Sequence, residues 1–247
     1  MNLQSIFKAL EEKRLNKAIS ETGFCSRREA DKLIEQGKVK VNGQAVGLGV
    51  KVTSADSISV NGNVVTKEVE NVYLAFNKPK GITCTTDLKD KTNIIEYINY
   101  PERIFPIGRL DKPSEGLIFL TNDGDIVNKI LRSKNNHDKE YVVTVDKRIN
   151  RAFAERMGSG VPILDTITKK CHVEIVDDYT FKIILTEGLN RQIRRMCDFL
   201  GYEVKRLKRI RIMNINLDTE PGQWRAFTKT ELDEVNRLVE GSSKTFD

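Results

Sequence analysis

The sequence contains few residues that bind metal ions or form disulfides. Among 247 residues there are four cysteines and two histidines, and no two cysteines form a Cys-X-X-Cys pair. Scattered cysteines of this kind predict free thiols in a reducing compartment. Two isolated histidines argue against a metal site, so we expect none.

Long apolar runs are also missing. No stretch is long enough to cross a bilayer, and the N-terminus lacks a signal-peptide pattern. Residues 6–15 have a helical pattern but carry five charged side chains. We therefore expect a cytoplasmic protein that does not enter a membrane. Its length allows a small and a larger domain.

Positive charge is concentrated in one part of the sequence. The chain has 41 lysines and arginines against 35 acidic residues, a net charge of +6. Between Arg191 and Arg211 eight basic residues stand against only Asp198 and Glu203, so this stretch alone has a surplus as large as that of the whole chain. Such a concentration favours a phosphate backbone over a small acidic metabolite as the partner.

Residues 12–70 have the pattern of a small α+β domain. The spacing of Ser26 and Glu29 predicts a capping box that starts a helix, and Gly37 is placed to end it. A shorter helix is expected before it. Strands are expected at 39–41 and 57–60, each followed by an Asn-Gly turn. A polar linker is expected at 68–71.

The second helix has a basic face. Arg28 and Lys32 are four residues apart, with Arg27 beside them. The charges alone fit a solvated surface as well as an RNA-binding one. The segments 15–17, 25–30, 34–39 and 41–43 together resemble the S4 RNA-binding domain. This resemblance implies that Arg27, Arg28 and Lys32 bind structured RNA.

Residues 71–240 alternate between strand and helix patterns. Strands are expected at 72–76, 117–120, 141–145 and 181–185, and helices at 125–131 and 189–200. The fold class is therefore α+β, with a small N-terminal domain and a larger domain that has a mixed or antiparallel sheet and flanking helices. The basic stretch 205–211 fits either an exposed strand edge or an RNA-binding surface, and the RNA-binding module favours the second.

Four short segments of the larger domain are candidates for chemistry: 77–81, 108–117, 139–141 and 187–196. Taken singly, they are a strand-ending turn, a loop carboxylate, a core tyrosine and a charged helix. The second segment places Asp111 between basic neighbours just before a buried strand. A carboxylate held ionised beside a cation in a sheltered cleft can act as a nucleophile or a base.

In order and spacing, these segments resemble pseudouridine synthases of the RsuA/RluB/RluE/RluF family over about residues 12–240. The combination GRLD…EGL…LTNDGD…KEY…GLNRQIRRM carries the resemblance. Segments 128–132, 160–164, 168–171 and 211–214 point to the RluF branch, which acts on large-subunit ribosomal RNA. Pro113 departs from the polar residue expected at its position, which affects loop detail and not the aspartate.

The resemblance implies isomerisation of a specific uridine to pseudouridine in large-subunit (23S) ribosomal RNA, without cofactor or metal. By motif position, Asp111 is the catalytic carboxylate, Arg194 its ion-pair partner and Tyr141 the residue that stacks on the uracil. The expected substrate-binding residues of this domain are Arg109, which fills the vacated base stack, Lys78 near the phosphate or base, Leu189 against the ring, and Arg191 on the basic surface.

Alternatives remain at this point. The same chemistry on small-subunit ribosomal RNA or tRNA fits the motifs equally, because RNA shape sets the target base. A non-catalytic RNA-binding factor in ribosome assembly is the other alternative, although all three catalytic residues are present. Asp111 can attack the sugar or remove a sugar proton. We expect a monomer.

Overall fold

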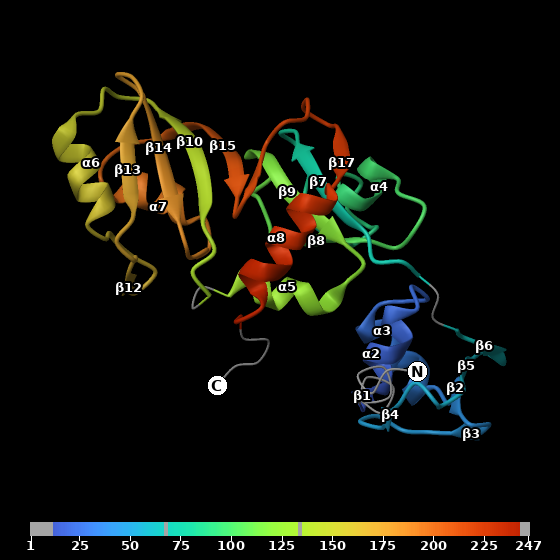
Figure 1. Cartoon of the computed structure of the whole chain (residues 1–247). Coiled ribbons are helices and arrows are strands. Elements are labelled where there is room, and N and C mark those ends of the chain that lie inside the picture. Colours follow the sequence, from blue (N-terminus) through green and yellow to red (C-terminus); the bar gives the residue numbers. More distant parts are fainter. Residues whose placement is uncertain (1–11, 67–68, 133–134, 243–247) are drawn as a thin grey trace. The chain divides into compact units, whose positions relative to one another are not determined.

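The computed structural model describes residues 12–66, 69–132 and 135–242 (Figure 1). The chain divides into two compact units. The first extends to Asn71 and includes Pro101–Arg103, and the second comprises Val72–Tyr100 and the chain from Ile104 onward. Each unit has its own buried apolar core. No helix in the described ranges is long and apolar enough to span a membrane.

The first unit consists of two helices and short strands. The helices are α2 (Leu15–Glu21) and α3 (Arg27–Glu35). A four-stranded sheet has the order β3 (Gln44–Ala45), β2 (Val39–Val41), β5 (Ile58–Val60), β6 (Asn63–Val64), and β1 (Lys13–Arg14) pairs with β4 (Lys51–Val52). The apolar faces of both helices are buried with the inner residues of these strands, so the helical spacing seen in the sequence defines this core.

Local signals in the first unit were read correctly, with two corrections. The Ser26 hydroxyl accepts the Glu29 backbone N–H at 3.1 Å and starts α3. The return bond from the Glu29 carboxylate, which would complete the predicted capping box, is not formed among the described residues. The predicted helix over 6–15 is wrong at Lys13–Arg14, which form a strand, while Leu15 is the first residue of α2; residues 6–11 and residue 68 of the predicted linker lie outside the described ranges.

The second unit is built on one nine-stranded sheet (Figure 1). Its strand order is β13 (His172–Ile175), β14 (Thr180–Leu185), β10 (Lys139–Val145), β15 (Val204–Ile212), β9 (Glu115–Thr121), β7 (Tyr73–Lys78), β17 (Trp224–Ala226). Two short strands lie off this path: β16 (Ile215–Asn216) pairs with β15, and β8 (Phe105–Ile107) pairs with β9. The helices are α4 (Ile94–Ile98), α5 (Gly124–Leu131), α6 (Arg151–Gly158), α7 (Gln192–Phe199) and α8 (Lys229–Val239), and β11 (Pro162–Ile163) with β12 (Thr166–Ile167) forms a separate hairpin.

Strand β9 is buried on both faces. Leu117 and Phe119 belong to the apolar cluster that includes residues of α5 and α8. Ile118 and Leu120 point to the other face and belong to the cluster that includes residues of α4. A strand covered on both sides needs an unbroken apolar run, which is why the sequence shows no polar–apolar alternation here.

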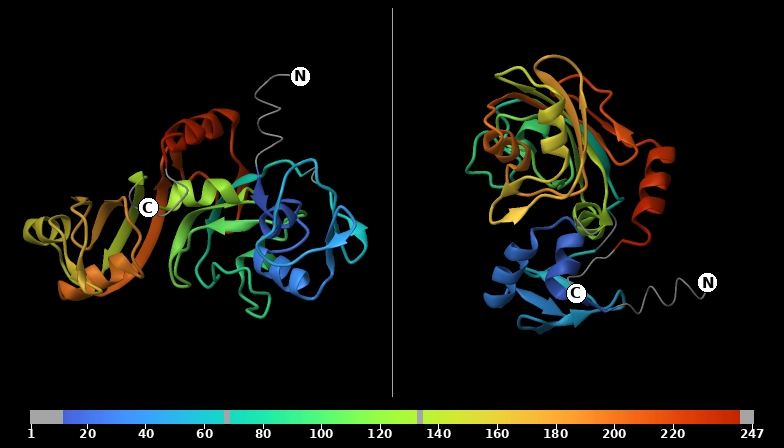
Figure 2. Two further views of the ribbon diagram at one scale, coloured as in Figure 1. Left: turned by 90° about the horizontal axis from the view of Figure 1, so that it is seen from below. Right: turned by 90° about the vertical axis from the view of Figure 1, so that its left-hand side faces the viewer.

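The sheet has a joint at its centre. Strands β9 and β15 are parallel and are paired only at Lys208↔Glu115 and Arg209↔Gly116. Gly116 has φ +105°, and a Cβ atom there would overlap the Arg209 carbonyl oxygen. Only glycine permits this approach. On one side of the joint lie β13, β14, β10 and β15 with α6 and α7, and on the other β9, β7 and β17 with α5 and α8; the left view of Figure 2 shows the same division.

The sequence-based expectations for α7, β15 and α8 need correction. Helix α7 begins at Gln192 and not at Leu189, because Arg191 has a left-handed backbone (φ +51°). Strand β15 lies inside the sheet between β10 and β9, so the alternative of an exposed strand edge at 205–211 is wrong. Helix α8 was not predicted, although Thr228 and Glu231 form a complete capping box at its start.

Candidate active site

A cleft of about 570 Å³ opens at the joint between the two parts of the sheet. Its volume lies in the range of pockets that enclose a small ligand. The loop that follows β8 forms one wall, and the segment that leads into α7 forms another. Side chains of β10 and β15 also line it. The cleft therefore combines residues from both sides of the joint.

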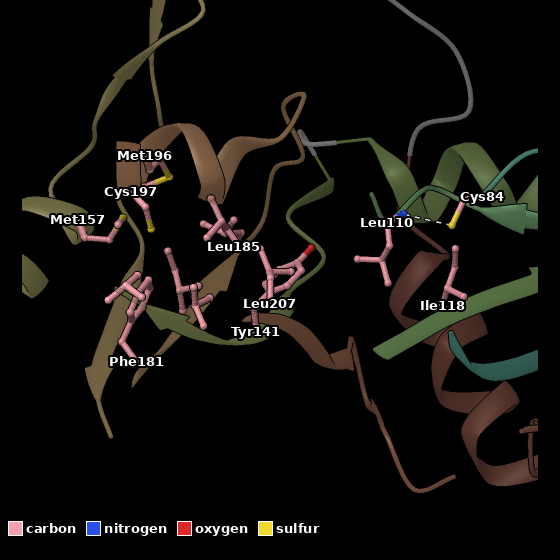
Figure 3. Close-up of a cluster of buried hydrophobic side chains, with 14 of the residues drawn as sticks. Cys84, Leu110, Ile118, Tyr141, Met157, Phe181, Leu185, Met196, Cys197 and Leu207 are labelled. Carbon is pink, nitrogen blue, oxygen red and sulfur yellow. Dashed lines mark hydrogen bonds between the residues drawn. The ribbon is translucent and has the colours of Figure 1, made fainter. Parts of the chain in front are cut away.

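Asp111 lies on the loop between β8 and β9, and that loop is fixed at several points. The Ser114 backbone N–H donates to the Asp111 carbonyl at 2.9 Å, and the Gly81 N–H donates to the Lys112 carbonyl at 2.8 Å. The Leu110 N–H donates to the buried Cys84 sulfur at 3.4 Å (Figure 3). The Asp111 side chain lines the cleft and is 32% exposed. The backbone is thus immobilised around a carboxylate that solvent and substrate can reach.

Arg194, on α7, is the cation nearest to this carboxylate. Its Nε lies 3.6 Å from Asp111 Oδ2, an ion-pair distance without a hydrogen bond. Its terminal nitrogens donate to Ser114 Oγ at 3.0 Å and to the Val204 carbonyl at 3.3 Å. Burial lowers the pKa of Arg194, and the charge of Asp111 acts in the opposite direction. The guanidinium is therefore held by neutral groups and keeps Nε directed toward Asp111.

Tyr141 lies on β10 and is 8% exposed, at the floor of the cleft. Leu185 and Leu207 lie next to its ring (Figure 3). On the neighbouring strand β15, Arg209 is its register partner, and the guanidinium carbon of Arg209 lies 5.9 Å from the ring centroid. The ring is therefore held by apolar neighbours and by a cation.

Lys78 does not line the cleft. It is 0% exposed, and its ammonium donates to the Pro79 carbonyl at 2.9 Å and the Ile82 carbonyl at 2.8 Å. Burial lowers its pKa, partly offset by Cys84 and Asp111. The predicted contact between Lys78 and a phosphate or base is therefore not supported by this structure. Its ammonium instead holds the turn that carries Gly81, which in turn bonds the Asp111 loop.

The other predicted substrate-binding residues of this unit border the cleft. Arg109 and Arg191 are exposed at its rim, and Leu189 is half-buried in its wall. The Leu189 N–H donates to Gln192 Oε1 at 3.0 Å, which connects the wall to the start of α7. In the first unit, the predicted RNA-binding residues Arg27, Arg28 and Lys32 are all exposed on α3.

Two buried basic residues of the cleft were not identified from the sequence. Lys139 is 8% exposed and donates to the His137 carbonyl at 3.1 Å; burial, and next the charge of Arg209, lower its pKa to about 8. Arg209 is 4% exposed. Lys139 could have been found because residues 139 and 141 share one face of a strand. Arg209 could not, because its place opposite Tyr141 depends on a strand pairing across 68 residues of chain.

The basic stretch 191–211 is not one continuous RNA-facing surface. Arg206 forms an ion pair with Glu115, and Arg211 pairs with Glu140 at 2.8 Å. Arg209 is buried in the cleft. The expectation of a single surface is corrected accordingly, since these residues divide between cleft and carboxylate partners. No group of three or more potential ligands among histidine, cysteine, aspartate and glutamate in the described ranges is arranged to hold a metal ion.

The fold agrees with the comparisons to known proteins. A family model described as RNA pseudouridylate synthase matches residues 72–199, and the S4 domain model matches residues 13–58. The chain belongs to the RNA pseudouridylate synthase family, with an N-terminal S4 domain, as the sequence motifs predicted.

Individual relatives place the chain within this family. The dual-specificity RNA pseudouridine synthase RluF of Salmonella typhi is 55% identical over 93% of this chain and 81% of its own length. The ribosomal large subunit pseudouridine synthase B of Bacillus subtilis is 38% identical over 94% of this chain and 99% of its own. A crystal structure of a pseudouridylate synthase has a TM-score of 0.67 at 32% identity, covering 90% of this chain and 99% of that one. The predicted likeness to the RluF branch is confirmed.

Proposed function

We propose that this protein isomerises a specific uridine to pseudouridine in large-subunit (23S) ribosomal RNA, with Asp111 as the catalytic carboxylate. The observation that carries the proposal is the approach of Asp111 and Arg194 to 3.6 Å, at the edge of a cleft with Tyr141 in its floor. These residues come from a loop, a helix and a strand distant in sequence. The Bacillus subtilis relative, which is named for the ribosomal large subunit, supports the choice of substrate.

The geometry suits a carboxylate that reacts in its ionised form. The Arg194 guanidinium lies 3.6 Å from the carboxylate, and no hydrogen bond to Arg194 occupies the Asp111 oxygens. An ionised carboxylate with free lone pairs can attack the sugar carbon C1′ or remove a sugar proton. Both routes break the bond between C1′ and N1 of the uracil and need no cofactor.

The target nucleotide has to leave its stack to reach Asp111. Extrusion costs on the order of a few kcal/mol, which protein contacts must offset. We assign Tyr141 to hold the flipped uracil, with Leu189 against the ring and Arg109 at the gap left in the RNA. Arg109 is exposed at the rim, where it can reach out of the cleft.

We further propose that residues 12–70 form the RNA-binding domain and residues 71–240 the catalytic domain. On α3, Arg27, Arg28 and Lys32 are exposed side by side, as phosphate-binding residues require. We place the protein in the cytoplasm as a monomer, where ribosomal RNA and a reducing environment for its four free cysteines are both found.

The test is to map pseudouridine in ribosomal RNA and tRNA from cells with and without this protein. Loss of one large-subunit pseudouridine on deletion, restored by the wild-type chain and not by Asp111→Asn, is the expected result. Asparagine keeps the shape of the side chain and removes only its charge, so comparable protein levels make the comparison fair. Restoration by Asp111→Asn would contradict the assigned mechanism, and an unchanged pseudouridine pattern on deletion would contradict the function.

A second substrate is the alternative with specific support. The RluF relatives are named dual-specificity enzymes, which supports a second RNA substrate for this chain, and we take tRNA as the candidate. Mapping tRNA from the same cells decides this, because a second lost pseudouridine would identify the second substrate.

A further inference from the structure

Arg209 has a position that structural needs alone do not explain. It lies on β15 at the joint, opposite Gly116 on one side and Tyr141 on the other. It is 4% exposed and lines the cleft. A buried arginine is usually paired with a carboxylate, because an unpaired buried charge is costly. Within the described residues, no carboxylate forms an ion pair with Arg209.

The contacts of the guanidinium fix its orientation. Its Nε donates to the Leu117 carbonyl at 2.6 Å, across the joint. Its Nη2 is sealed from solvent without a hydrogen-bond partner, and the group lies against the Tyr141 ring. Its Nη1 likewise makes no hydrogen bond with the described residues and is not among the sealed atoms. One donor of a rigidly held cation is thus left for the contents of the cleft.

The surroundings of Arg209 add to its positive charge. Lys139 is buried on the same side of β10, two residues before Tyr141, and among the described residues its ammonium donates to the His137 backbone carbonyl alone. Burial and the charge of Arg209 lower the pKa of Lys139, and the charge of Asp138 acts in the opposite direction. Two buried cations, neither of them in an ion pair with a carboxylate of the described residues, make the floor of the cleft favourable for a ligand that carries negative charge.

The reaction generates such a charge. When the C1′–N1 bond breaks, its electron pair goes to the uracil, and the negative charge spreads over N1 and the two carbonyl oxygens. The ring then turns, C5 forms the bond to C1′, the proton on C5 leaves and N1 takes up a proton. The product is an isomer of the substrate, and only the detached ring carries the extra charge.

We propose that Arg209 is a further catalytic residue, whose Nη1 donates a hydrogen bond to a carbonyl oxygen of the uracil and stabilises the negative charge on the detached ring. The inference rests on the proposed function. The Leu117 carbonyl and the Tyr141 ring hold the guanidinium in place before the substrate arrives, so no reorganisation is needed when the charge develops. Lys139 contributes to the same field from its buried position.

The test uses the full-length protein in excess over an RNA that carries the mapped uridine, under single-turnover conditions. Arg209→Gln keeps a donor and removes the charge. It should slow disappearance of the N-linked uridine by about 10²–10³-fold, as removal of a preorganised donor does in other enzymes. Its RNA affinity should change by less than about threefold, because the charge develops only after binding. Arg209→Lys, which keeps a cation, should recover part of the rate.

A second substrate separates charge stabilisation from a structural role. Fluorine at C5 withdraws electrons, so a detached 5-fluorouracil ring needs less stabilisation. The decrease in single-turnover rate caused by Arg209→Gln should therefore be at least about tenfold smaller on RNA carrying 5-fluorouridine than on RNA carrying uridine. A factor of ten corresponds to about 1.36 kcal/mol of activation free energy. Arg225→Gln, which removes a partly buried guanidinium away from the cleft, should leave both rates unchanged.

If Arg209→Gln lowered the rate equally on the two RNAs, or lowered only the RNA affinity, the proposed role of Arg209 would be overturned. The proposed function of the protein would not be affected. A wild-type protein without activity on either RNA would instead refute the proposed function. If Arg209→Gln does not fold, Arg209→Lys replaces it in the test, since lysine keeps the charge but displaces the donor. Its decrease in rate should again be smaller on the 5-fluorouridine RNA than on the uridine RNA, and equal decreases would overturn the role of Arg209.

Discussion

The second unit contains two groups of basic side chains with opposite arrangements. On β17, the edge strand of the sheet, Arg225 donates to both Asp218 oxygens and both Glu231 oxygens at 2.7–2.9 Å. These hydrogen bonds raise the pKa of Arg225 and lower that of Glu231. In the cleft, Arg194 reaches Asp111 only at 3.6 Å, and burial lowers the pKa of both Arg194 and Lys139.

The difference separates basic residues that hold the fold from those that await a substrate. The Arg225 network satisfies its own charges, as a structural ion-pair network should. The cleft keeps cations buried without sufficient counter-charge, which reduces stability and prepares the site for an anionic ligand. The predictions below test this contrast, beginning with the largest expected effect on stability.

Gly116→Ala should destabilise the protein most, because the cleft depends on the close approach of β9 and β15. The new Cβ would overlap the Arg209 carbonyl oxygen and lie 2.7 Å from its nitrogen, in a backbone with φ +105°. We expect a loss of about 2–5 kcal/mol in the free energy of unfolding, measured by urea denaturation. Gly124→Ala is the control, since nothing lies within 4 Å of that position; a similar loss there would mean that the joint has no special role.

Lys139→Met should stabilise the fold and slow the reaction. The folded pKa of Lys139 is about 8, below its ordinary 10.5, so the unfolded chain binds the extra proton between these pH values and stability rises with pH there. The full penalty is present below pH 8. We therefore expect a gain on the order of 1–3 kcal/mol at pH 7 that shrinks toward pH 10.

Urea denaturation of the wild type and Lys139→Met at pH 7 and pH 10 measures this difference. Lys182→Met, at a solvent-accessible ion pair with Glu174, provides the control and should show no pH-dependent gain. A destabilised Lys139→Met at pH 7 would place Lys139 with the structural residues and weaken the contrast.

Arg225→Gln should show the opposite pattern. Removing the guanidinium leaves Asp218 and Glu231 without their partner, and since the network is partly exposed we expect a loss of about 1–2 kcal/mol. Thermal unfolding measures the loss. The single-turnover rate at a temperature where the variant is folded should stay within about twofold of the wild type. A large drop in rate would show that the network also supports the cleft.

Replacing Arg27, Arg28 and Lys32 by glutamine extends the contrast to the first unit. These cations are exposed, so the free energy of unfolding should change by less than about 0.5 kcal/mol. RNA affinity should fall. In a plot of the logarithm of the binding constant against the logarithm of the salt concentration, the slope should become shallower by about 2, as expected when up to three phosphate contacts are lost. An unchanged slope would remove α3 from the RNA-binding surface.

Local patterns in the sequence predicted much of the fold. The Ser26 hydroxyl, the Asn-Gly turns and the apolar run at 117–120 each fix a nearby structure by short-range physics. The short hairpin β11–β12 and helix α6 were not predicted, although Asn150 caps the start of α6 and its buried Phe153 and Met157 are four residues apart. The start of α7 was misplaced because Arg191 adopts a left-handed backbone, which the sequence does not indicate for arginine.

The sequence predicted the site residues that belong to motifs. It did not predict those that strand pairing brings into the cleft. Asp111, Arg194, Tyr141, Arg109, Leu189 and Arg191 all line one cleft. Lys78 does not line the cleft, because the turn that follows it folds back and its carbonyl groups bind the buried ammonium. Arg209 was assigned to a surface, since a run of alternating basic residues does not reveal that both neighbours of the strand are other strands. The roles of these residues in catalysis remain the proposals made above.

The central place of β15 also bears on how the chain matures during synthesis. The core of the first unit uses residues between Leu15 and Val60 and can form as soon as they leave the ribosome. The large sheet is different. Its two parts are joined by β15, which begins at Val204, and its last strand in the order is β17, which begins at Trp224. A nascent chain therefore has its S4 domain long before it has a cleft. We expect it to be able to hold RNA before it can modify any.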